Sequence, residues 1–141
     1  DVYGHLYGTS SRQVERERAG GHDIILEIDV QGAESIREKI ADAISVFILP
    51  PSAELLRDRL IARGTDSAAA LETRLRGAAS EVEQYRHFKY VILNDDINRA
   101  SQQLAAVIYA ERARRERQEV SLRDALEDFG VFPTRGQNRE R

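Results

Sequence analysis

Two carboxylates stand two residues apart in an otherwise apolar run, and this spacing is the first sign of chemistry in the chain. Residues 24–30 carry Glu27 and Asp29 between aliphatic side chains. Side chains of a strand alternate with a period of two, so both acids would point to the same side. Burying a carboxylate is costly unless its charge is compensated. We therefore favour acids that serve a ligand, metal or arginine at a strand end; the alternative is an edge strand with one wet face.

Three arginines form the second candidate group. Arg59 and Arg63 lie four residues apart and share one face of a predicted helix, and Arg74 follows on the next helix, beyond a break at 64–66. Like charges at this spacing are mildly unfavourable, and an anion between them would reverse that effect. A helical hairpin could aim all three guanidinium groups at one phosphate. The spacing alone still favours a solvated surface of mixed charge, which is common in proteins.

Two short polar segments are weaker candidates. Tyr7 and Thr9 flank Gly8 and offer two hydroxyl groups to a polar ligand, although such a segment is more often only a turn. Asn94 follows a predicted strand and precedes a predicted helix. Residues 94–96 therefore read first as a helix cap, while an asparagine at the carboxyl end of a strand could also hydrogen-bond a base.

The composition excludes several classes of function. The chain has 141 residues, which suits one domain, and a net charge of −3, which offers no general basic field for nucleic acid. No apolar run approaches the ~20 residues of a membrane span. Cysteine is absent, which excludes disulfides and thiolate zinc sites and fits a reducing compartment, so we expect a cytoplasmic protein. The sequence does not indicate an oligomeric state.

These residues must be positioned by alternating helices and short apolar strands. This pattern predicts an α/β fold with a parallel sheet covered by helices. Three strands are few for such a sheet, so the sheet is small or part of it lies outside this sequence. The expected strands are 23–30, 43–49 and 90–93, and the expected helices are 10–19, 32–42, 52–63, 67–87, 97–118 and 121–128. Ser10, Ser52 and Asp66 are the expected N-caps of the helices that follow them.

Six sequence blocks, in this order and spacing, make residues 1–118 resemble guanylate kinase. The blocks are HLYGTS (5–10), LEIDVQGA (26–33), PPS (50–52), RL with RGTD (59–66), RL (74–75) and NDD (94–96). The resemblance implies a P-loop nucleotide kinase that moves the γ-phosphate of ATP to GMP, with Mg²⁺ as cofactor.

The resemblance also implies roles in substrate binding. Tyr7 would hydrogen-bond the phosphate of GMP, Thr9 would meet guanine O6, and Asp29 would accept from the guanine amino edge. Asn94 matches a residue near the adenine of ATP. GMP and ATP are the expected partners, and we expect the chain to bind neither nucleic acid nor a membrane.

The remaining roles implied by the resemblance concern the transferred phosphate. Arg59, Arg63 and Arg74 match lid arginines that clamp the phosphoryl group. Glu27 takes the place of an acid near the metal and phosphates, where many relatives have aspartate, which leaves direct or water-mediated contact open.

One departure from the family pattern is large. The 141 residues contain no Gly-x-x-x-x-Gly-Lys-Ser/Thr loop, which the family carries before the part matched here. We therefore expect a kinase fold truncated at its N-terminus and inactive by itself. The expected domains are a remainder of the GMP-binding region (1–22), core (23–58), helical lid (59–88), core (89–120) and a C-terminal helix with a frayed tail (121–141).

Two other functions are kept as alternatives. Guanylate-kinase-like domains of scaffold proteins bind phosphopeptides without catalysis, and a related kinase could act on another phosphorylated acceptor, such as a ribosyl bisphosphate. The three arginines argue against the first, and the pairing of Thr9 with Asp29 favours guanine over the second.

Overall fold

A short parallel sheet of two strands organises the first part of the chain. The computed structural model describes residues 8–64 and 67–131. Strand β1 (Val46–Leu49) pairs in parallel with β2 (Tyr90–Leu93), in a register that runs from Val46 opposite Tyr90 to Leu49 opposite Leu93. Both strands consist of β-branched, aromatic and leucine side chains, which fit a pleated sheet. The prediction of an α/β fold with a parallel sheet is confirmed.

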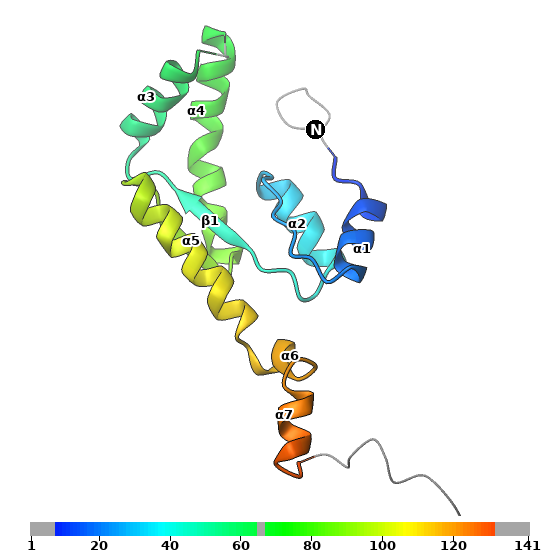
Figure 1. Cartoon of the computed structure of the whole chain (residues 1–141). Coiled ribbons are helices and arrows are strands. Elements are labelled where there is room, and N and C mark those ends of the chain that lie inside the picture. The colour runs from blue at the N-terminus through cyan, green and yellow to red at the C-terminus, as the bar shows by residue number, and fades with distance from the viewer. Residues whose placement is uncertain (1–7, 65–66, 132–141) are drawn as a thin grey trace, which may run out of the picture. The chain divides into compact units, whose positions relative to one another are not determined.

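A helical hairpin connects the two strands (Figure 1). Helices α3 (Ala53–Arg63) and α4 (Ala68–Glu83) contact each other, and the 3₁₀ turn η1 (Gln84–His87) continues α4. The Ser52 hydroxyl caps α3 by accepting from the Leu55 N–H at 3.1 Å, as predicted. Gly64 ends α3 at a φ of 66°, a conformation that glycine adopts without strain.

The start of α4 differs from one detail of the prediction. The Ser67 hydroxyl accepts from the Ala70 N–H at 3.3 Å and is the N-cap of this helix. Asp66, which we expected as the cap, lies outside the described residues. The predicted helix over 67–87 is otherwise present as α4 with η1.

Two short helices precede the sheet. Helix α1 (Ser11–Ala19) begins after Ser10, whose hydroxyl accepts from the Gln13 N–H at 3.4 Å, and helix α2 is Val30–Lys39. The predicted strand over 23–30 was wrong, because residues 22–29 form neither helix nor strand. A strand exists only when a neighbour accepts and donates its backbone hydrogen bonds, and in the described residues β1 and β2 pair with each other alone.

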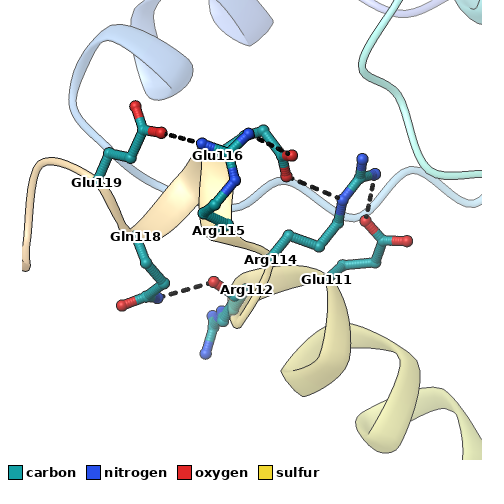
Figure 2. Close-up of polar contacts among 7 residues, drawn as sticks. All are labelled: Glu111, Arg112, Arg114, Arg115, Glu116, Gln118 and Glu119. Carbon is teal, nitrogen blue, oxygen red and sulfur yellow. Dashed lines mark hydrogen bonds and ion pairs between the residues drawn. The ribbon is translucent and has the colours of Figure 1, made fainter.

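The chain divides by its contacts into two units, one ending at Asp96 and one beginning at Ile97. The second unit holds α5 (Ile97–Arg112), α6 (Arg115–Gln118) and α7 (Arg123–Asp128). The long helix predicted over 97–118 is thus interrupted at 113–114, and Figure 2 shows the charged side chains at this interruption. No described helix is long and apolar enough to cross a membrane.

The core of the described residues is small. Its buried apolar side chains are Val14, Ala33 and Ile92 in the first unit and Ala100 in the second. The sheet itself is only partly covered, because Val91 and Leu93 remain 45% and 44% exposed. The predicted domain boundaries remain predictions.

Candidate functional site

The three candidate arginines lie on the hairpin formed by α3 and α4. Arg59 and Arg63 are exposed and four residues apart on α3, and Arg63 is the last residue of that helix. Arg74 is half-buried on α4. The contact between the two helices therefore places all three arginines on one helical hairpin, while their expected role in clamping a phosphoryl group remains a prediction.

Arg59 ties this hairpin to the carboxyl edge of the sheet. Its Nη2 donates to the backbone carbonyl of Asn94 at 3.0 Å. The Asn94 N–H in turn donates to the carbonyl of Leu49 at 2.8 Å, so Asn94 lies where both parallel strands end. The structure thus brings two predicted site residues into contact. Sequence reasoning missed this contact, since 35 residues separate the partners and no local pattern links them.

Asp29 has a structural role as a helix cap. It is the N-cap of α2, and its Oδ1 accepts from the Gly32 N–H at 2.8 Å. The Asp29 carboxylate and the Gly32 backbone lie so close that a Cβ added to Gly32 would be 3.2 Å from Asp29 Oδ1. Asp29 is half-buried and Glu27 is exposed, so the burial penalty that singled out these acids applies to neither. Their expected roles in ligand binding remain predictions.

The two hydroxyl residues are placed only in part. Thr9 is exposed and stands directly before Ser10, the N-cap of α1. Tyr7, expected to contact the GMP phosphate, lies outside the described residues. The segment with Thr9 and the segment with Glu27 and Asp29 flank the same helix in the sequence.

The residues present are compatible with Mg²⁺ held mainly by water and phosphate. Across residues 8–64 and 67–131, no three histidine, cysteine, aspartate or glutamate side chains gather as a protein-built cation cage would require. Mg²⁺ usually keeps several waters and takes only one or two carboxylates besides substrate phosphates. The exposed carboxylate of Glu27 suits such a water-mediated contact.

Comparisons with known proteins bear on the family to which this chain belongs. The family model described as guanylate kinase matches residues 1–111. The guanylate kinase of Neisseria meningitidis serogroup A is 45% identical over 128 residues, which are 91% of this chain and 62% of the relative. That of Chelativorans sp. is 48% identical over 130 residues, which are 92% of this chain and 57% of the relative.

A solved structure supports the same relationship. The crystal structure of guanylate kinase from Anaplasma phagocytophilum matches with a TM-score of 0.59 and 26% identity, covering 92% of this chain and 79% of that chain. In contrast, this chain spans less than two thirds of the length of the Neisseria meningitidis and Chelativorans relatives. With a family model that matches most of its residues, the chain belongs to the guanylate kinase family.

Proposed function

We propose that this chain provides the guanine-reading and phosphoryl-clamping parts of an enzyme that phosphorylates GMP with ATP. The contact between Arg59 and the Asn94 carbonyl carries this proposal. It attaches an arginine-bearing hairpin to the sheet edge where ligands of open α/β folds bind. Family membership supports the nucleotide kinase chemistry.

Phosphoryl transfer requires positioning and neutralisation of negative charge rather than a protein nucleophile. Arg59, Arg63 and Arg74 would supply that charge, because guanidinium groups form paired hydrogen bonds to phosphate oxygens. A hairpin that closes over the nucleotides would also exclude water from the γ-phosphate. Bound Mg²⁺ would neutralise charge on the ATP phosphates, and Glu27 would hold it through water.

Guanine differs from adenine by an exocyclic amino group and a carbonyl oxygen. Asp29 would accept from the amino edge, Thr9 would donate to O6, and Tyr7 would bind the phosphate of GMP. A carboxylate has two oxygens, so Asp29 can cap α2 through Oδ1 and accept from the base through Oδ2. Asn94 would lie beside the adenine of ATP.

Calorimetric titration of the 141-residue chain with GMP, AMP and a phosphoserine peptide tests the proposal. We expect GMP to bind more tightly than AMP, and Asp29→Asn to weaken GMP binding about tenfold through the loss of one charged acceptor. Asparagine still caps a helix, so this variant isolates the ligand contact. Glu15→Gln, on the exposed side of α1, is the matched control.

Two results would contradict the assignment. Equal affinity for GMP and AMP would show that the chain does not select guanine, and preference for the phosphoserine peptide would favour the non-catalytic binding module.

We also expect the 141 residues alone to release no ADP from ATP and GMP in a coupled assay, because they contain no phosphate-binding glycine-rich loop. Turnover by the chain alone would refute that expectation.

A further inference from the structure

A hollow of about 310 Å³ lies at the opposite end of the strands from Asn94. It borders the amino ends of β1 and β2, where the N–H groups of Lys89 and Tyr90 donate to the Ser45 carbonyl at 3.1 Å. Among the described residues predicted to contact nucleotides, none belongs to its lining. The hollow is therefore a feature separate from the proposed nucleotide site.

Positive charge gathers around this hollow although the chain as a whole carries a charge of −3. Arg37, Arg86 and Lys89 line it, and His87 adds a further cation when protonated. No aspartate or glutamate belongs to its described lining. A concave site lined by charges of one sign concentrates its counter-ions, so this hollow favours an anion.

The guanidinium of Arg37 is held at the wall by stacking. Its carbon lies 5.2 Å from the centre of the Phe88 ring, and Phe88 packs edge-on against Phe47 at 5.0 Å between ring centres. In the described part of the chain, the buried Nη1 of Arg37 finds no hydrogen-bond partner. Arg37 also lines the hollow, so its guanidinium adds to the positive charge there.

A hydroxyl group completes the wall. Ser45 Oγ accepts from the Lys89 N–H at 3.1 Å, so its own O–H proton can be donated to another acceptor. Backbone hydrogen bonds between Ser45 and the segment before β2 hold this hydroxyl and the Lys89 backbone in place. The hollow thus combines three cations with a positioned neutral donor.

We propose that the hollow formed by Arg37, Ser45, Arg86, His87 and Lys89 binds the phosphoryl group of a small molecule. A phosphate monoester carries about −1.5 to −2 charges at neutral pH, which matches three cations better than a single carboxylate does. The volume lies at the low end of small-molecule sites and suits one phosphoryl group. Inorganic phosphate and an organic monophosphate share this chemistry.

Amide chemical shifts of the ¹⁵N-labelled 141-residue chain test this proposal at constant ionic strength. Titration with inorganic phosphate or glycerol 3-phosphate should shift the amides of Ser45 and residues 86–89 saturably, whereas glycerol and chloride should not. Tighter binding of glycerol 3-phosphate would identify an organic ester as the ligand, and tighter binding of inorganic phosphate would identify the free ion.

Variants separate this hollow from other anion sites. Arg86→Gln and Lys89→Gln should each weaken phosphate binding about tenfold, the usual effect of losing one charge-assisted hydrogen bond. Both side chains are exposed, so the fold should survive, and Lys89→Arg should retain binding. Arg57→Gln on α3, an exposed arginine outside the hollow, should change nothing.

Several results would overturn the proposal. It fails if phosphate shifts only amides of 59–74, which would place the anion on the arginine hairpin. It also fails if chloride reproduces the shifts, or if the glutamine variants bind phosphate as the unmodified chain does.

Discussion

Asp29 illustrates how one side chain can serve both folding and binding. Its Oδ1 satisfies the Gly32 N–H in the first turn of α2, a donor that would otherwise lack a partner within the helix. The resemblance assigns the same carboxylate to guanine. At the scale of single residues, the sequence showed that Asp29 offers a carboxylate acceptor. It did not show that Asp29 caps α2, because we expected a strand over 23–30.

The cap can be tested independently of any ligand. Asp29→Ala should lower the free energy of unfolding by about 1 kcal/mol, because it removes the acceptor that caps α2. Asp29→Asn should cost much less, since asparagine caps equally well. Urea denaturation followed by circular dichroism measures both. Equal losses in the two variants would mean that the charge, and not the cap, stabilises this helix.

Glu17 should be more acidic than an ordinary glutamate. Its Oε2 lies 2.9 Å from His22 Nδ1, and Arg16 donates to its Oε1 at 2.9 Å. These hydrogen bonds, with that of His22 the larger influence, lower the pKa of Glu17, while slight desolvation opposes them. The contribution to stability is present above the unfolded-state pKa and is lost as the pH falls through the folded-state value.

A carboxyl NMR titration of Glu17 checks this expectation. The pKa of Glu17 should lie below its ordinary value and should rise toward it in His22→Gln, because that substitution removes the larger influence. A titration curve that His22→Gln leaves unchanged would contradict the assigned cause.

At the scale of elements, the interruption between α5 and α6 is surrounded by ion pairs (Figure 2). Arg114 contacts Glu111 at 3.4 Å and Glu116 at 3.6 Å, and Arg115 contacts Glu119 and Glu116. The amide of Gln118 donates to the Arg112 carbonyl at 2.8 Å and so satisfies an acceptor near the end of α5. These contacts stabilise a bend that helical periodicity alone did not predict.

The two arginines at this bend should differ in their effect on stability. Glu111 is only 5% exposed, so Arg114→Gln weakens the pairing of a buried charge and should cost about 1 kcal/mol. Arg115 pairs with exposed glutamates, and Arg115→Gln should cost less than about 0.5 kcal/mol. Chemical denaturation of both variants measures the difference. A larger loss for Arg115→Gln would show that the exposed pairs hold the bend.

At the scale of the whole molecule, both units expose apolar side chains within the described residues. Ile48, Val91 and Leu93 on the sheet are each more than two fifths exposed, and Phe129 in the second unit is 84% exposed. A chain with little buried apolar area has little to offset its conformational entropy. Family membership is nevertheless clear, because it rests on similarity of sequence along most of the chain and does not require a complete core.

The isolated 141-residue chain should therefore bind the dye ANS, since exposed apolar surface attracts the dye. Fluorescence titration measures this binding. Absence of dye binding would contradict this expectation and would mean that the exposed sheet surface is protected in solution.

Local physical chemistry made much of this protein readable from its sequence. Ser10 and Ser52 cap their helices as predicted, Gly64 ends α3, and the strands at 46–49 and 90–93 lie within the predicted apolar runs. Such features depend on residues within one helical turn or one strand, so their spacing along the chain is sufficient to predict them.

Only the tertiary structure decided the features that join distant segments. Residues 22–29 include an apolar run typical of a strand but form none, because a strand requires a pairing neighbour and in the described residues β1 and β2 pair only with each other. The hydrogen bond from Arg59 to the Asn94 carbonyl and the cationic hollow around Arg37 likewise join residues 35 or more positions apart. Contacts of this kind follow from how elements pack, which no local spacing encodes.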